Sequence, residues 1–166
     1  MALTVSFALI SLFTLSCTKT DSLSFADQYG QFSSANLNSQ IALLPFQSIS
    51  DAEKISLLHM REEEKLARDV YITLYNKHGV KVFDNISMSE QTHTDAILQL
   101  LTKYSINDPI GTNAVGVFTD PGLQALYTSL VNSGNVSILE AYKVGATIED
   151  LDLYDLKVDL LKVDNQ

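Results

Sequence analysis

Residues 51–79 read DAEKISLLHMREEEKLARDVYITLYNKHG, and this stretch decides the fold. Before it, Ser50-x-x-Glu53 is a capping box, and at its end His78-Gly79 is a typical helix stop. Between these signals apolar or small side chains recur at helical spacing, at Leu57, Met60, Ala67, Val70, Tyr71 and Leu74. The pattern predicts one long amphipathic helix from Asp51 to His78, with one face turned toward a core.

The sequence after this helix predicts three more helices and a long crossover. The second helix should begin near Asn85 or Ser87 and end at Tyr104, and residues 105–118 have the Gly, Asn and Pro content of a loop. A short helix should follow from Pro121 to between positions 132 and 135. Ser137-x-x-Glu140 is a second capping box and opens a last helix through Leu161, which Gly145 and Thr147 could interrupt. With no competing strand pattern, we expect an all-α, up-down helical bundle.

Length and charge narrow the class of protein. The 166 residues, 46% of them hydrophobic, fit one domain with one sizeable core. The formal net charge of -9 produces a surface that repels phosphate backbones. We therefore do not expect this protein to bind nucleic acid.

The N-terminus predicts export and a lipid anchor. Residues 1–16, MALTVSFALISLFTLS, form an uncharged apolar run that is too short to span a membrane and is typical of a signal peptide. Cys17 follows in a setting that resembles the lipobox of bacterial lipoproteins, although Thr14 departs from it and no Lys or Arg precedes the run. The alternative is an incidental or buried cysteine. The expected location is a bacterial membrane surface, periplasmic or outer-membrane facing.

Residues 17–48 predict a flexible tether. They are rich in Ser, Asn, Gln and Asp, and no helical or strand period persists. An apolar patch from Ile41 to Phe46 could dock on the domain that follows, which we place at residues 49–166.

The first long helix carries a carboxylate on its apolar stripe. Glu64 lies in line with Met60, Ala67 and Tyr71, so it should face the core and need a partner there. Glu63 borders the stripe and is the better candidate for supporting the site from behind. The alternative is that this acidic run is a solvated face.

The second helix offers a metal clamp. Glu90 and His93 lie one turn apart on the stripe that continues through Ile97, and carboxylate-bridged bundles use this i, i+3 pairing. The alternative is that Glu90 completes a capping box with Ser87, which would leave His93 as an ordinary semi-buried imidazole.

Together the two helices predict half of a dimetal site. Helices joined by a short turn pack antiparallel, so Glu64 can meet Glu90 and His93 near the middle of the bundle. Arg68, one turn on, could support the site through hydrogen bonds or remain at the surface. Tyr71 is close enough to donate a hydrogen bond or to act as a redox neighbour.

Four motifs in order resemble the ferritin-like family called domain of unknown function 2202. They are residues 60–71 (MREEEKLARDVY), 89–93 (SEQTH), 115–119 (VGVFT) and 144–152 (VGATIEDLD), and the resemblance covers about residues 44–166. It implies a ferritin-like bundle with a dimetal centre. For a ligand on the last helix we choose Glu149, which lies inside the fourth motif, over Glu140, which has a capping role; an exposed Glu149 is the alternative.

The predicted site is incomplete. A full ferritin-like site needs a second Glu-x-x-His pair, and the other histidines, His59 and His78, do not form one. The family resemblance implies one further long helix, which we expect to be missing here. The remaining ligands would then come from another chain, through a homo-oligomer that completes the bundle, or the product is truncated.

The leading functional hypothesis is a metal-binding protein that uses two Fe or Mn ions for oxidation by dioxygen or peroxide. Glu64, Glu90 and Glu149 would bind or bridge the ions, and His93 would cap one of them. Two alternatives remain open: a lipid-anchored, non-enzymatic helical module that binds a protein partner, and an inactive fragment.

Overall fold

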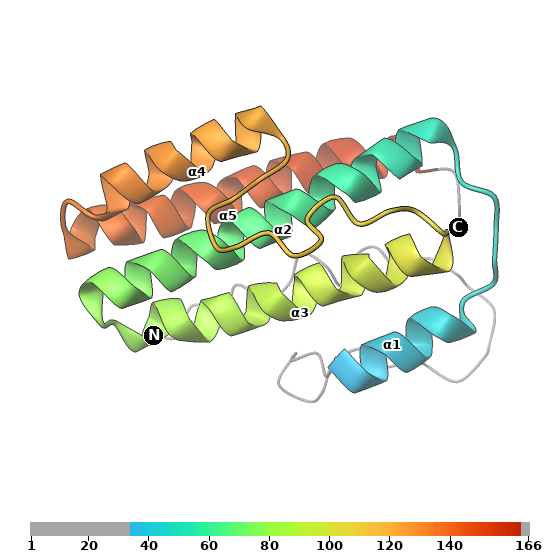
Figure 1. The fold of residues 1–166 in the computed structure, drawn as a ribbon, viewed down its shortest axis with the longest axis horizontal. Coiled ribbons are helices and arrows are strands. Elements are labelled where there is room, and N and C mark those ends of the chain that lie inside the picture. Colours follow the sequence, from blue (N-terminus) through green and yellow to red (C-terminus); the bar gives the residue numbers. More distant parts are fainter. Residues whose placement is uncertain (1–33, 164–166) are drawn as a thin grey trace.

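The computed structural model describes residues 34–163, and Figure 1 shows them folded into five helices with no strand among the described residues. The helices are α1 (Ser34–Leu43), α2 (Asp51–His78), α3 (Lys81–Lys103), α4 (Pro121–Gly134) and α5 (Ile138–Leu160). The predicted all-α bundle is confirmed. No helix in this range is both long and apolar enough to cross a membrane.

Helix α2 has the bounds that its end signals predict. The Ser50 side chain accepts a hydrogen bond from the Glu53 backbone N–H, and the Glu53 carboxylate accepts one from the Ser50 backbone N–H at 2.7 Å. At the other end Gly79 has φ 68°, the left-handed conformation that closes a helix without a Cβ clash. Local sequence therefore fixes both ends of this helix.

Helix α3 begins at Lys81, earlier than predicted. Ser87 is inside the helix, where its hydroxyl donates to the Asp84 carbonyl oxygen at 2.8 Å, so it does not cap anything. Val80, the residue before the helix, provides no side-chain cap. Burial of Phe83 in the core provides the stabilisation that a cap would otherwise give. The capping-box alternative for Glu90 is therefore wrong.

Helix α5 is continuous from Ile138 to Leu160, so the interruption considered at Gly145 and Thr147 does not occur. Gly145 lies against Tyr71, where an added Cβ would meet the ring at an ordinary contact distance of 3.4 Å. The Thr147 hydroxyl donates to the Lys143 carbonyl oxygen within the helix.

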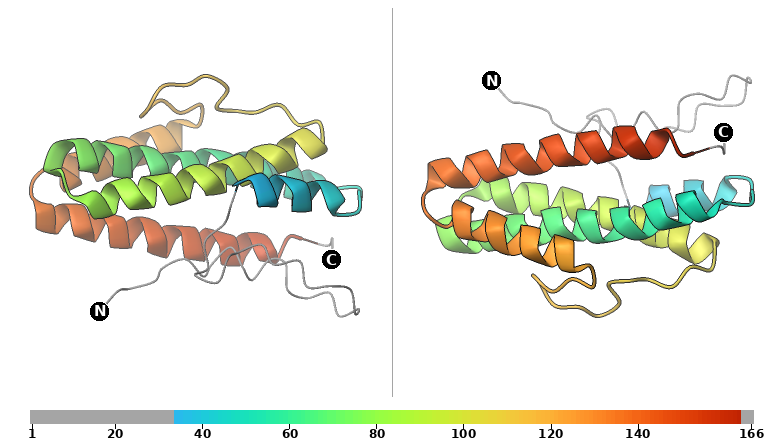
Figure 2. Two further views of the ribbon diagram at one scale, coloured as in Figure 1. Left: turned by 90° about the horizontal axis from the view of Figure 1, so that it is seen from below. Right: turned by 90° about the horizontal axis from the view of Figure 1, so that it is seen from above.

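The helices alternate in direction around α2. In Figure 1, α2 and α4 run one way and α3 and α5 the other, and α2 contacts α3, α4 and α5. In both views of Figure 2, α5 lies to one side of the pair formed by α2 and α3. The main core comprises Leu66, Ala67, Val70, Tyr71, Leu74, Phe83, Phe118, Leu123, Leu130, Ala141, Val144 and Ile148.

Helix α1 corrects the prediction of a flexible tether over residues 17–48. Leu37 and Ile41 are buried against Ala96 and Leu100 of α3. The Lys103 ammonium donates to the carbonyl oxygens of Ile41 and Leu44. Its positive charge offsets the partial negative charge at the C-terminal end of α1. Contact with α3 stabilises a helix that its polar sequence does not reveal. The signal peptide, Cys17 and the tether up to residue 33 lie outside the described residues.

The crossover between α3 and α4 is attached to one face of α2. The Glu62 carboxylate accepts hydrogen bonds from the backbone N–H groups of Thr119 and Asp120, both at 2.8 Å. The buried Lys65 ammonium is paired with Asp69 and also donates to the Ala114 carbonyl oxygen.

Two further contacts fasten the same loop. Asp69 accepts a hydrogen bond from the Gly116 backbone N–H at 2.8 Å, and Arg61 donates to both carboxylate oxygens of Asp108 at 3.1 and 3.0 Å. Most charged residues of the 60–71 motif therefore hold the loop.

Candidate metal centre

Glu64, Glu90 and His93 converge from α2 and α3, as predicted. The His93 Nδ1 atom lies 2.9 Å from Glu90 Oε2 and 3.3 Å from Glu64 Oε2. One donor atom from each of the three residues lies within 4.8 Å of the other two. The side chains are mostly buried, with exposed fractions of 12% for Glu64, 7% for Glu90 and 18% for His93.

The protonation behaviour of this cluster reflects crowded negative charge. Burial raises the pKa of Glu64 to about 7, against the opposing effect of His93, and the nearby Glu90 raises it further. For His93, burial alone lowers the pKa, but hydrogen bonds with Glu64 and Glu90 outweigh it and raise the pKa to about 10. In the absence of a metal, a proton on His93 occupies the place of a cation between the two carboxylates.

The cluster has few positive partners. Across residues 34–163, the only cationic side chain within ion-pair distance of Glu64 and Glu90 is His93. Arg68, predicted to support the site, donates to Asp69 and to the Gln91 side-chain oxygen. Gln91 is the neighbour of Glu90 on α3, so Arg68 reaches the helix that carries the cluster, and its supporting role stays a prediction.

Glu149 faces the same space from α5 and is held by Tyr71. The Tyr71 hydroxyl donates to Glu149 Oε1 at 2.9 Å and approaches the Gly145 carbonyl oxygen at 3.3 Å. Burial, and then repulsion by Glu90, raise the pKa of Glu149, while the Tyr71 hydrogen bond lowers it. Glu149 is outside the close three-residue cluster, although it is near enough to interact with Glu90 and His93.

Asp152 is a further carboxylate that the sequence reasoning did not select. Burial raises its pKa to about 9, and the charges of Glu64, Glu90, Glu149 and Glu63 all contribute in the same direction. A signal was present, because Glu149-x-x-Asp152 repeats on α5 the one-turn spacing that Glu90 and His93 have on α3.

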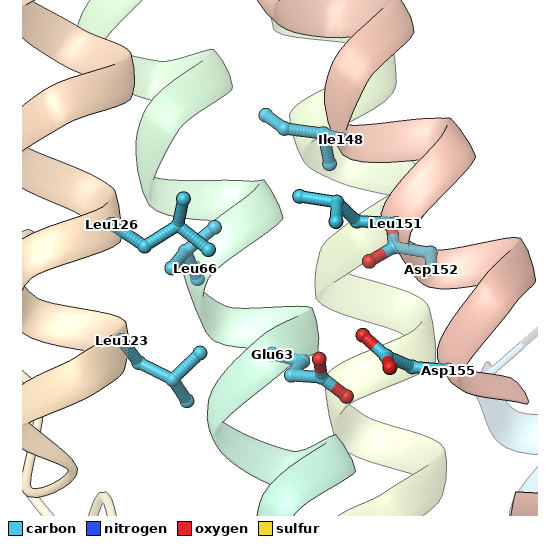
Figure 3. Close-up of a pocket in the computed structure, with 8 residues that line it drawn as sticks. All are labelled: Glu63, Leu66, Leu123, Leu126, Ile148, Leu151, Asp152 and Asp155. Carbon is cyan, nitrogen blue, oxygen red and sulfur yellow. The ribbon is translucent and has the colours of Figure 1, made fainter. Parts of the chain in front are cut away.

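Glu63 lies beside a small cavity between α2, α4 and α5. The cavity has a volume of about 50 Å³ and is lined by the carboxylates of Glu63, Asp152 and Asp155 together with leucine and isoleucine side chains. Figure 3 shows the carboxylates of Glu63 and Asp155 facing each other. Glu63 also accepts from His59 Nδ1 at 2.9 Å, so it is directed toward α5 and the start of α2.

The other residues that were considered have structural roles. The Ser137 hydroxyl accepts from the Glu140 backbone N–H, and the Glu140 carboxylate pairs with Lys143 at 2.7 Å on the surface. His78 Nε2 lies 2.8 Å from the Gly134 carbonyl oxygen and links the ends of α2 and α4. The choice of Glu149 over Glu140 therefore agrees with their positions.

The donor set suits a divalent metal ion. Carboxylate oxygens and one imidazole nitrogen are ligands that Fe and Mn accept, and each must lose its proton to bind. Buried carboxylates whose pKa values are raised, with one imidazole between them, are unfavourable in free energy unless a cation is present. The chemistry of these residues would therefore fit an Fe or Mn ion.

These features define an all-α bundle with carboxylate and imidazole groups gathered between three helices. The chain belongs to the uncharacterized protein domain family DUF2202, whose model matches residues 53–166. It is 55% identical over 126 residues to the uncharacterized protein MJ0754 of Methanocaldococcus jannaschii, which covers 76% of this chain and 68% of that protein. The crystal structure of hypothetical protein MJ0754 matches with a TM-score of 0.72 and 56% identity, over 74% of this chain and 70% of the other.

Proposed function

We propose that this protein binds two Fe or Mn ions between α2, α3 and α5 of a ferritin-like bundle and uses them for oxidation by dioxygen or peroxide. The observation that carries the proposal is the convergence of Glu64, Glu90 and His93 within 4.8 Å in a largely buried setting. Bound ions would supply the redox chemistry.

The side chains of the protein would bind the metal ions and orient one another. Glu64 and Glu90 approach the same imidazole nitrogen from two helices, so their oxygens can share a cation that replaces its proton. Glu149 and Asp152 would add carboxylate oxygens from α5. Tyr71 would fix the direction of Glu149 through its hydrogen bond, as outer residues do for metal ligands generally.

Metal analysis of the purified chain tests this proposal. Iron or manganese should bind in stoichiometric amounts, and Glu90→Gln and His93→Ala should each lower the affinity beyond the ~10–100-fold that loss of an outer residue produces. His59→Ala and Glu140→Gln are matched controls, because these residues lie outside the cluster. A folded protein that binds neither metal, or equal binding by the cluster variants and the controls, would refute the proposal.

A protein-binding role is the second candidate, supported by apolar side chains on the surface of α5. Leu139, Leu153 and Tyr154 are 61%, 49% and 65% exposed. A partner, or a second copy that completes the bundle, could cover such side chains. Sedimentation analysis with and without metal tests this, since a metal-free chain that stays monomeric and binds no added partner contradicts it.

We also propose that the chain is exported and lipid-anchored through Cys17, on the basis of its N-terminal sequence. Expression in a bacterium with a labelled fatty acid should label the parent chain and leave Cys17→Ser unlabelled. An unlabelled parent chain would contradict lipidation.

A further inference from the structure

Three aromatic rings lead from the candidate metal centre to the protein surface. The rings of Tyr71 and Phe83 stack with centroids 6.3 Å apart, and those of Phe83 and Tyr142 lie 5.3 Å apart. Tyr71 and Phe83 are almost fully buried, at 1% and 2% exposure, whereas Tyr142 is 49% exposed. The row therefore has one end beside Glu149 and the other in contact with solvent.

We propose that this row carries single electrons from a small reductant at Tyr142 to the metal centre, with Tyr71 as the redox-active residue beside it. The inference rests on the proposed function, because an oxidised centre is the electron acceptor. Its oxidant is a peroxide, and its reductant is a one-electron donor of the ascorbate or phenol class.

The oxidation of Tyr71 has one acceptor for the electron and another for the proton. The phenol O–H bond breaks, the electron goes to the oxidised centre, and the proton moves along the 2.9 Å hydrogen bond to Glu149 Oε1. A neutral tyrosyl radical remains, so no net charge is created in the buried site.

The step at Tyr142 restores Tyr71. An electron passes from Tyr142 through the Phe83 ring to Tyr71, which recovers its proton from Glu149, while the exposed Tyr142 hydroxyl releases its own proton to water. The external donor then returns one electron to Tyr142, which regains a proton from water. Two such cycles supply the two electrons that, with two protons, convert hydrogen peroxide to two water molecules.

Other tyrosines provide matched controls. Tyr127 also packs on a phenylalanine, Phe118, with centroids 5.5 Å apart, but its hydroxyl bonds to Thr73. Tyr154 is exposed on α5, like Tyr142. Conversion of either control to Phe should leave electron transfer to the centre unchanged.

Electron paramagnetic resonance of the iron-loaded chain tests the proposal. Hydrogen peroxide without reductant should generate a tyrosyl radical, whose spectrum narrows when the protein carries ring-deuterated tyrosine. Tyr71→Phe should abolish this signal, whereas Tyr127→Phe and Tyr154→Phe should retain it. Iron content is measured on the same samples.

Decay of the radical on adding ascorbate tests the path to the surface. Tyr142→Phe should keep the Tyr71 signal but slow its decay by about tenfold or more, which corresponds to a barrier ~1.4 kcal/mol higher. Phe83→Leu should do the same, and Tyr142→Phe alone decides the matter if Phe83→Leu does not fold.

The outcomes separate the two proposals. Bound iron with no tyrosyl radical, or a radical that survives Tyr71→Phe, overturns the role of Tyr71. Equal decay in Tyr142→Phe, Tyr154→Phe and the parent chain overturns the path through Tyr142. Failure to bind iron overturns the inference, and failure to bind manganese as well refutes the proposed function.

Discussion

Helix α2 presents acidic residues to two different environments. Glu62 faces the crossover loop, where two backbone N–H groups donate to its carboxylate. Glu64, two residues on, faces α3, where its ion-pair partner is the imidazole that it shares with Glu90. The same residue type is fully satisfied on one face and short of positive charge on the other.

The difference separates structural charge from charge available for binding. On the loop face the buried Asp69 carboxylate pairs with two cations, Lys65 and Arg68. On the other face Glu64, Glu149 and Asp152 all have raised pKa values because they are buried and because nearby carboxylates, Glu90 among them, repel their charge. A buried excess of carboxylates needs a further cation, whereas a carboxylate that already has cationic partners does not.

Breaking the loop face should have the largest effect on stability. Asp69→Ala leaves the Lys65 ammonium buried with one carbonyl partner and removes the acceptor for the Gly116 N–H. We expect a loss of about 3–5 kcal/mol in the free energy of unfolding, measured by urea denaturation. Metal bound per folded molecule should not change, and a loss of metal would show that the two faces are not independent.

Removing a carboxylate from the opposite face should affect metal rather than folding. Because the pKa of Asp152 is about 9, the residue is protonated near neutral pH without metal, and Asp152→Asn imitates that form. We expect apo-protein stability close to that of the parent and metal affinity weaker by ~10–100-fold, by calorimetric titration. Unchanged affinity would exclude Asp152 from the site.

The stability of the apo protein should fall as pH rises. Folding raises the pKa of Glu64 to about 7, of Asp152 to about 9 and of His93 to about 10, so the folded state holds more protons than the unfolded state. Stability is then greatest below the unfolded values and is lost as pH rises through the folded ones. Urea denaturation should show a decrease of several kcal/mol between pH 5 and pH 8, since three groups lose their extra protons in or above this range, and saturating metal should reduce this slope. If the stability of the apo protein does not change with pH, the raised pKa values of these buried groups are contradicted.

The same substitution at Glu62 and at Glu64 compares the two faces of α2 directly, and here we expect the smallest changes in stability. Glu62→Gln should destabilise the protein by about 1–2 kcal/mol, since one neutral amide oxygen replaces a carboxylate that accepts two N–H groups. Glu64→Gln should leave apo stability at pH 8 equal or higher and should remove metal binding. Thermal unfolding and metal content, measured on both variants, distinguish them. If the two variants change thermal stability and metal content equally, the two faces of α2 do not differ in the way proposed.

Sequence alone determined the elements whose signals are local. Ser50, Glu53 and Gly79 set both ends of α2, and helical periodicity placed Glu64, Glu90 and His93 on inward-facing stripes. Spacing within a helix is fixed by backbone geometry, so one helix turn suffices to predict which side chains share a face.

Only the tertiary structure decided the rest. The polar segment of α1 is helical because α3 buries Leu37 and Ile41, and Arg68 donates both to Asp69 and to Gln91 of α3. The carboxylate of Asp152 comes near Glu64 only because α5 packs against α2. These outcomes depend on contacts between segments far apart in the chain, whose burial and charge no local pattern encodes.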